Sequence, residues 1–142
     1  STDFLQLVRF GLRRADDAAV RGTLCLVDAV LRAETPSGPV WRRYGGDGYG
    51  EHPDGQPYDG TGQGRPWPLL AGERGHHDLV AGGDPTPHLR TMVRASGRLG
   101  LIPEQVWDGA PIPHRGLLPG RPTGSAMRLV WGHAEFVKLA AS

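Results

Sequence analysis

Apolar residues recur at helical spacing in five stretches of the chain. In 3–14 and 17–32 they fall three or four positions apart, and acidic residues at the start of each stretch can cap a helix. The stretches 67–81, 84–97 and 125–140 repeat the pattern. Two glycines inside 67–81 lower helix propensity, so they predict close packing of a neighbouring helix. Five helices are therefore predicted, with no convincing strand between them.

The first two predicted helices are separated by only a few residues, which predicts an antiparallel helix hairpin. The second carries Leu26 and Val30 beside its main apolar stripe, which predicts packing on two sides. Cys25 lies in the same apolar pattern, and cysteines in such patterns are usually core residues. The sequence ETPSGP at 34–39 ends this helix, because proline and glycine both oppose its continuation.

Two long segments without periodicity, 40–66 and 98–124, connect the helices. Segments of this length are usually either functional or disordered. The first contains eight glycines, but it also holds Trp41 and all three tyrosines of the chain, whereas disordered segments have few aromatics. We therefore expect ordered loops that build a site. The fold class predicted for 1–142 is all-α: one domain of helix hairpins joined by long, ordered Gly/Pro-rich loops.

Charge and composition exclude several classes of function. The chain has 16 basic and 15 acidic residues, so a net charge of +1 gives no case for a nucleic-acid or anionic-membrane partner. No run of about 18 apolar residues is present, so no transmembrane segment is predicted. The six histidines lack ligand spacing, so neither a metal nor a cofactor is predicted. A single cysteine excludes an internal disulfide and leaves the compartment open.

The two long loops gather aromatics, arginines and carboxylates, which are the residue types that bind sugars. Aromatic rings cover the apolar C–H faces of a sugar, and charged side chains bind its hydroxyls in fixed geometry. A helical domain with glycine-rich connections is the alternative. Glu104, in GLIPEQVWD, is either a catalytic base beside Trp107 or a loop carboxylate that caps a turn or pairs with Arg115 or Arg121. Glu73 is expected to be structural and to pair with an arginine.

Four longer motifs follow one another along the chain: WRRYGGDGYGEHPDG, GTGQGRPWPLLAGERGHHDL, GLIPEQVWD and RPTGSAMRLVWGHAEFVKL. In this order they resemble the C-terminal part of bacterial glucoamylases and glucodextranases, glycoside hydrolase family 15, over essentially the whole chain. The resemblance implies an (α/α)6 barrel, and 1–142 would be the C-terminal portion of that single catalytic domain. The chain departs from the family pattern at Arg128, where relatives usually have proline, and near His77, where they have an aromatic.

The resemblance also implies the chemistry. Enzymes of this family release glucose from the non-reducing ends of α-linked glucans with inversion, using one glutamic acid as general acid and one glutamate as general base. Glu104 matches the base, and no residue of this chain matches the acid. Arg43 matches the arginine that binds the terminal glucose, and Trp67 matches an aromatic residue of the pocket.

Further residues are expected to add to this pocket: Tyr44, Asp47 and Glu51 from the same loop, and Trp107 near the base. Because the chain begins with Ser1, we expect it to continue a longer protein that supplies the acid. Alone it should be inactive and should bind its missing half or self-associate. The alternatives are a non-catalytic helical fragment, which would bind carbohydrate or serve only a structural role, and a trehalase of the same family.

Overall fold

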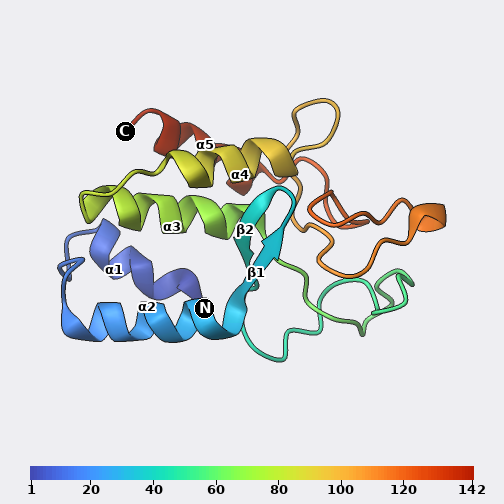
Figure 1. Cartoon of the computed structure of the whole chain (residues 1–142), viewed down its shortest axis with the longest axis horizontal. Coiled ribbons are helices and arrows are strands. Elements are labelled where there is room, and N and C mark those ends of the chain that lie inside the picture. The colour runs from blue at the N-terminus through green and yellow to red at the C-terminus, as the bar shows by residue number, and fades with distance from the viewer.

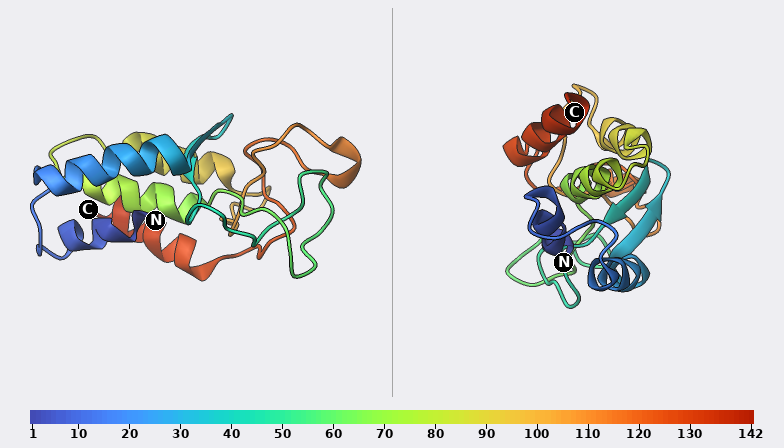
Figure 2. Two further views of the ribbon diagram at one scale, coloured as in Figure 1. Left: turned by 90° about the horizontal axis from the view of Figure 1, so that it is seen from below. Right: turned by 90° about the vertical axis from the view of Figure 1, so that its left-hand side faces the viewer.

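The computed structural model describes all residues 1–142, with the helices at one end and the long loops gathered at the other (Figure 1). In chain order the elements are η1 (Thr2–Leu5), α1 (Gln6–Arg9), α2 (Ala18–Leu31), β1 (Arg32–Thr35), β2 (Gly38–Trp41), α3 (Pro68–Val80), α4 (Thr86–Ala95), η2 (Pro113–Arg115) and α5 (Val130–Ala140). Helix α3 lies in the middle, with α1 and α5 on one side and α2 and α4 on the other (Figure 2).

One element was not predicted from the sequence pattern: a hairpin in which β1 pairs antiparallel with β2. The chain is therefore mainly helical rather than all-α. The Thr35 hydroxyl donates to the carbonyl of Gly38 at 2.8 Å and closes the turn, where Gly38 adopts a φ of +124° that glycine tolerates without strain. Each strand has only four residues, which is too short for an alternating pattern to stand out.

The first and last helices are shorter than predicted. Helix α1 ends at Arg9, and Gly11, with a φ of +72°, turns the chain where the pattern predicted helix to residue 14. Helix α5 begins at Val130 instead of residue 125, because the preceding segment pairs with a distant loop. The amide of Glu104 donates to the carbonyl of Ala126 at 2.8 Å. Local periodicity cannot reveal such a long-range pairing.

Helix α2 starts as predicted, since the Asp17 carboxylate accepts the amide of Ala19 at 2.8 Å. It packs on only one side within this chain. Val27 and Leu31 join the main apolar core, whereas Leu26 and Val30 are exposed. Cys25 is also exposed, so its predicted place in the core is wrong. The second packing surface predicted for this helix has no partner in residues 1–142.

Close packing around α3 is confirmed, and its two glycines allow it. A Cβ on Gly72 would lie 2.6 Å from Cγ of Glu135 and 3.1 Å from Sδ of Met92. A Cβ on Gly75 would lie 2.5 Å from Cδ2 of Leu139. These contacts come from α4 and α5, so α3 is pressed between both helices where a side chain would separate them.

Buried polar contacts complete the helix packing. Asp78 of α3 accepts hydrogen bonds from His77 and from His88 of α4, and it pairs with Arg74. Burial alone raises the pKa of Asp78, but these bonds and the charge of Arg74 hold that pKa well below its usual range. The carboxylate is therefore ionised near neutral pH, and its bond to His88 connects α3 to α4.

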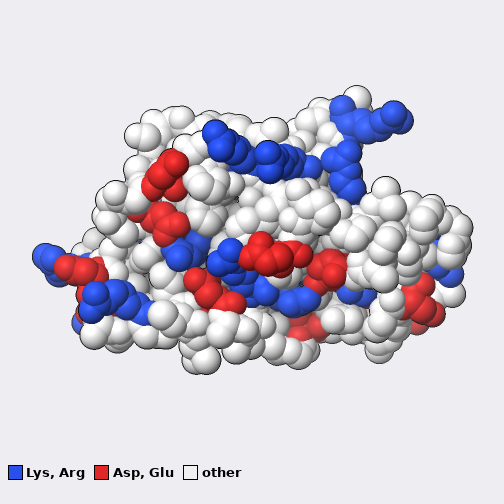
Figure 3. Space-filling view, viewed as in Figure 1, with Lys and Arg blue, Asp and Glu red and all other residues white.

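Charges of both signs alternate across the middle of the face in Figure 3, while a row of basic side chains covers α4. Some ion pairs span elements, such as Arg74 of α3 with Asp28 of α2 at 3.6 Å. None of the helices has the length and apolar character that crossing a membrane requires.

Alanine at Gly75 should destabilise the protein relative to alanine at Gly22 of α2. Both positions lie inside helices, so both substitutions gain similar helix propensity, about 1 kcal/mol. A Cβ at Gly22 meets no atom within 4 Å, whereas at Gly75 it meets Leu139 and His88. Because overpacking costs about 1–3 kcal/mol, denaturant titrations should separate the two variants by that amount. Equal stabilities would contradict the tight packing.

Candidate functional site

The first long loop places an arginine among three aromatic rings, just beyond the end of β2. Nε and Nη2 of Arg43 each donate to one oxygen of Asp47 at 2.8 Å. The guanidinium carbon lies 5.3 Å from the ring centroid of Tyr44 and 5.0 Å from the centroids of Tyr49 and Trp67. The bidentate pair and the rings fix the orientation of the arginine. Its Nη1 bonds to no group of this chain and remains a free donor.

The Arg43–Asp47 pair is ionised on both sides. Hydrogen bonds to Asp47 raise the pKa of Arg43 above its usual value. Burial by itself raises the pKa of Asp47, but bonds from Arg43 and from the amide of Tyr49 lower it below its usual value. The loop therefore carries a permanent, half-buried guanidinium whose partner is already in place.

The second long loop places Glu104 beside this arginine. The Glu104 side chain is buried, with the residue 8% exposed, and its Oε2 accepts a hydrogen bond from the hydroxyl of Tyr49 at 3.0 Å. Burial, and then the bond to Glu104, raise the pKa of the Tyr49 phenol above its ordinary value. The phenol therefore stays protonated and donates to the Glu104 side chain.

Tyr49 was not among the predicted site residues. Its contact with Glu104 joins positions 55 residues apart, and no local spacing reports such a contact. The only sequence signal was its position two residues after Asp47, inside the motif that carries Arg43.

A cleft of about 570 Å³ opens beside Arg43 and extends along α3 between α1 and α5. Arg43, Tyr44 and Trp67 lie at its wall, so the structure brings these three predicted residues together. The indole Nε1 of Trp67 is buried and has no hydrogen-bond partner in this chain. The volume falls within the range of small-molecule sites.

Glu73 lines the same cleft, and no arginine pairs with it. The expectation of an arginine partner is therefore wrong. Instead its carboxylate accepts the hydroxyl of Thr2 at 2.7 Å and the side-chain amide of Gln6 at 3.2 Å. Burial raises the pKa of Glu73, against the opposing effect of the Thr2 bond. The N-terminal segment thus supplies neutral donors where the sequence suggested a charged partner.

Glu51 and Trp107 are buried where the two long loops pack against each other. Oε1 of Glu51 accepts the amide of Gly124 at 2.6 Å, and its Oε2 is buried without a partner. Trp107 is 1% exposed, with its Nε1 donating to the carbonyl of Ala110 at 2.7 Å. Within this chain the Trp107 ring has no open face. That both residues contact substrate stays a prediction.

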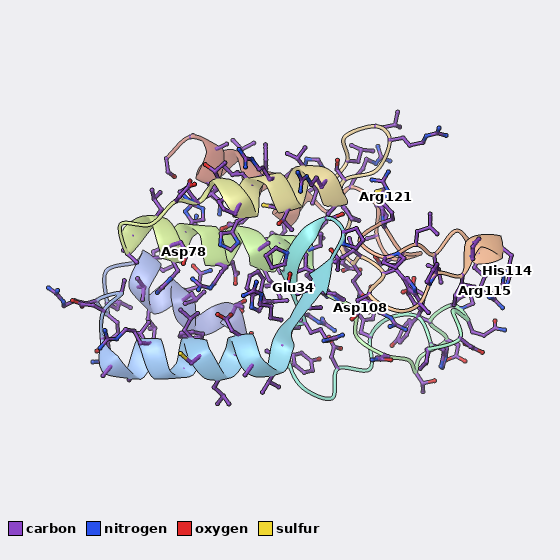
Figure 4. The ribbon with its side chains drawn as sticks, in the orientation of Figure 1. Glu34, Asp78, Asp108, His114, Arg115 and Arg121 are labelled. Carbon is purple, nitrogen blue, oxygen red and sulfur yellow. The ribbon has the colours of Figure 1, made fainter.

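The alternative partners proposed for Glu104 lie elsewhere. Figure 4 places Arg115 at the far tip of the loop cluster, in η2, and Arg121 near the end of α4. Arg121 donates to the backbone carbonyl of Arg94 at 3.3 Å. Asp108, labelled near the hairpin, pairs with Arg42 and Arg65. No group of three or more His, Cys, Asp or Glu side chains converges in a way that could hold a metal ion.

Comparison with known proteins gives a consistent result. No family profile matches the chain. The chain is 45% identical to a glucoamylase from Clostridium sp. (strain G0005) over 139 residues, which is 98% of this chain and 18% of that protein. The chain thus spans less than a fifth of that relative's length.

Two solved structures share the fold. A bacterial glucoamylase, whose crystal structure is of its complex with acarbose, matches with a TM-score of 0.90 and 45% identity over 99% of this chain and 20% of its own. A glycosidase described as wild type matches with a TM-score of 0.64 and 25% identity over 94% of this chain and 33% of its own. Over nearly its whole length the chain is therefore similar in sequence and in fold to part of a glucoamylase, in agreement with the resemblance that its motifs carry.

Proposed function

We propose that the protein containing this chain is an inverting, exo-acting glucosidase that releases glucose from the non-reducing ends of α-linked glucans. The observation that carries the proposal is the buried Glu104 carboxylate, held by the Tyr49 hydroxyl at 3.0 Å beside Arg43, in a chain that matches a glucoamylase over its length. Residues 1–142 would supply the general base and part of the sugar pocket.

In this proposal Glu104 acts on a water molecule. The carboxylate takes a proton from the water, whose oxygen attacks the anomeric carbon from the face opposite the leaving sugar. The bond to the glycosidic oxygen breaks, and that oxygen takes a proton from a general acid. Inverting enzymes keep the two carboxyl groups roughly 6.5–9.5 Å apart to leave room for the water. We assign the acid to a part of the protein outside residues 1–142.

The remaining residues would position the terminal sugar. Free Nη1 donors on Arg43 can bind sugar hydroxyls, because Asp47 occupies only Nε and Nη2. Trp67 and Tyr44, at the wall of the cleft, can cover an apolar sugar face. Asp47 would act as a positioning residue through Arg43. Acarbose in the related glucoamylase crystal supports an oligosaccharide as the ligand class.

Exposed apolar side chains support the proposal that the helices continue into an (α/α)6 barrel. Phe10 and Trp131 both line the cleft, and Trp131 is 70% exposed in this chain. Large aromatic side chains at the wall of a cleft usually meet another part of the protein or a ligand. We therefore place 1–142 as the C-terminal portion of one barrel domain.

Replacing Glu104 with glutamine should abolish most turnover in the intact enzyme. The amide keeps the shape of the side chain but cannot accept the proton, and losing a general base typically costs about 10²–10⁴-fold in kcat. Glucose release from maltose measures the effect. Glu34→Gln, the same change at an exposed position of β1, should leave kcat unchanged. Near-normal turnover by Glu104→Gln would reject the assignment.

Tyr49→Phe should lower kcat for glucose release from maltose by the intact enzyme. The Tyr49 hydroxyl donates to Oε2 of Glu104 at 3.0 Å, and without it the proposed base loses the hydrogen bond that positions it. A hydrogen bond to a charged group contributes about 1.5–3 kcal/mol, so kcat should fall roughly tenfold or more. An unchanged kcat would show that Tyr49 does not act through Glu104.

Residues 1–142 alone should not release glucose, because the proposal assigns the general acid to none of them. The exposed aromatic side chains beside the cleft should also make the isolated chain self-associate. A maltose-hydrolysis assay and light scattering on the purified chain measure both properties. An active monomer would show that a carboxyl of this chain, such as Glu51 or Glu73, serves as the acid.

A further inference from the structure

A second cavity, separate from the cleft beside Arg43, lies on the first long loop. Its volume is about 670 Å³, and its lining comes entirely from residues 52–59. Within this lining, Tyr58 is the aromatic residue, and His52, Asp54, Gln56 and Asp59 are polar. The proposed mechanism uses none of these side chains.

Hydrogen bonds and tight packing contacts define the path of the loop around this cavity. The amide of His52 donates to the carbonyl of Gln56 at 3.0 Å, and the Asp54 carboxylate accepts the amide of Gln56 at 3.0 Å. Gly55, with a φ of +80°, rests on the other long loop. A Cβ there would lie 2.8 Å from Cδ1 of Ile112 and 2.9 Å from Cδ1 of Leu117. The cavity therefore has a preformed wall.

Tyr58 connects the cavity to the catalytic carboxylate. Its ring packs edge-on against Tyr49, with centroids 5.1 Å apart and an interplanar angle of 76°. The Tyr49 hydroxyl bonds to Glu104 at 3.0 Å. Arg43 lies 5.0 Å from the same Tyr49 ring. Tyr49 thus contacts both the arginine proposed for the terminal sugar and the tyrosine of the second cavity.

The chemistry of the cavity suits a sugar. The Tyr58 residue is 45% exposed, so part of its ring can meet a C–H face. One oxygen of Asp59 is occupied by Thr61 and His52, and one oxygen of Asp54 by Gln56, which leaves the other oxygen of each carboxylate free to accept sugar hydroxyls. The two carboxylates do not converge with a third ligand, so the cavity lacks the donors of a cation site.

We infer that Tyr58 and the 52–59 cavity bind the leaving part of the glucan, the sugars beyond the bond that is cleaved. The inference rests on the proposed function, because it takes the terminal glucose to lie at Arg43 and Glu104. The rest of a glucan whose terminal glucose is bound there has to leave the site past one of the flanking protein surfaces. The surface next to Tyr49 on the side of Tyr58 offers an aromatic face and hydroxyl acceptors within a rigid loop.

Two substrates test the inference in the intact enzyme. α-Glucosyl fluoride has no sugar on the leaving side, whereas maltoheptaose has six. Tyr58→Ala should lower kcat/KM for maltoheptaose by about tenfold, the size expected from one aromatic contact, and should leave kcat/KM for α-glucosyl fluoride unchanged. Tyr58→Phe keeps the ring and should retain activity on both substrates.

Other outcomes distinguish a failure of this inference from a failure of the proposed function. If Tyr58→Ala lowers kcat/KM for both substrates equally, the residue supports Glu104 through Tyr49 and the inference fails. If neither value changes, the cavity does not bind the glucan and the inference also fails. If the unsubstituted enzyme hydrolyses neither substrate, the proposed function itself is wrong. Melting temperatures of both variants show whether a loss of activity reflects unfolding.

Discussion

The buried guanidinium of Arg65 holds together the two long loops on which the site depends. Arg65 is 3% exposed, and its Nη2 donates to the backbone carbonyls of Glu51 and His52 in its own loop. Its Nη1 pairs with Asp108 of the other loop at 3.1 Å, and its guanidinium carbon lies 4.0 Å from the centroid of the Trp107 ring. A buried charge is tolerated only when it is paired and hydrogen-bonded, and Arg65 meets that condition across both loops.

These contacts of Arg65 between the two loops determine the position of Glu104. Arg43 and Tyr49 belong to one loop and Glu104 to the other, so the Tyr49–Glu104 bond forms only if the loops keep their register. Gln105 reinforces that register, because its side-chain amide donates to the carbonyl of Tyr49 and its side-chain oxygen accepts the amide of Arg65. Glycine-rich loops can act as a rigid support here because buried side chains, and not helices, determine their path.

The hairpin and the helices position the residues at the wall of the cleft. Trp41, at the end of β2, donates to Asp28 of α2 at 2.8 Å, and its backbone carbonyl accepts the amide of Trp67 at the start of α3. The hairpin therefore fixes where α3 begins. Arg43 follows Trp41 and Trp67 precedes α3, so the packing of α3 sets both walls of the cleft. Tight contacts at Gly72 and Gly75 then hold α3 against α4 and α5.

Much of this protein follows from its sequence. Apolar spacing located the five helices, and glycines within one of them predicted close packing. The order of the longer motifs predicted the similarity to glucoamylases and led to the hypothesis that Glu104, Arg43 and Trp67 belong to the site. These features are local, since each depends on neighbours within a few residues or on a continuous motif. The same local logic placed Cys25 in the core, because an apolar pattern cannot show which face of a helix has a partner.

Tertiary structure decided the rest. The late start of α5, the neutral partners of Glu73 and the Tyr49–Glu104 contact all depend on residues that are distant in sequence. The hairpin is local, but its strands of four residues are too short to show an alternating pattern. The energy of the long-range contacts comes from burying polar groups with complementary partners, and a partner is known only when the whole chain is folded. Residue types and spacing could therefore suggest which side chains belong to the site, whereas only the packing of the loops determined which of them touch.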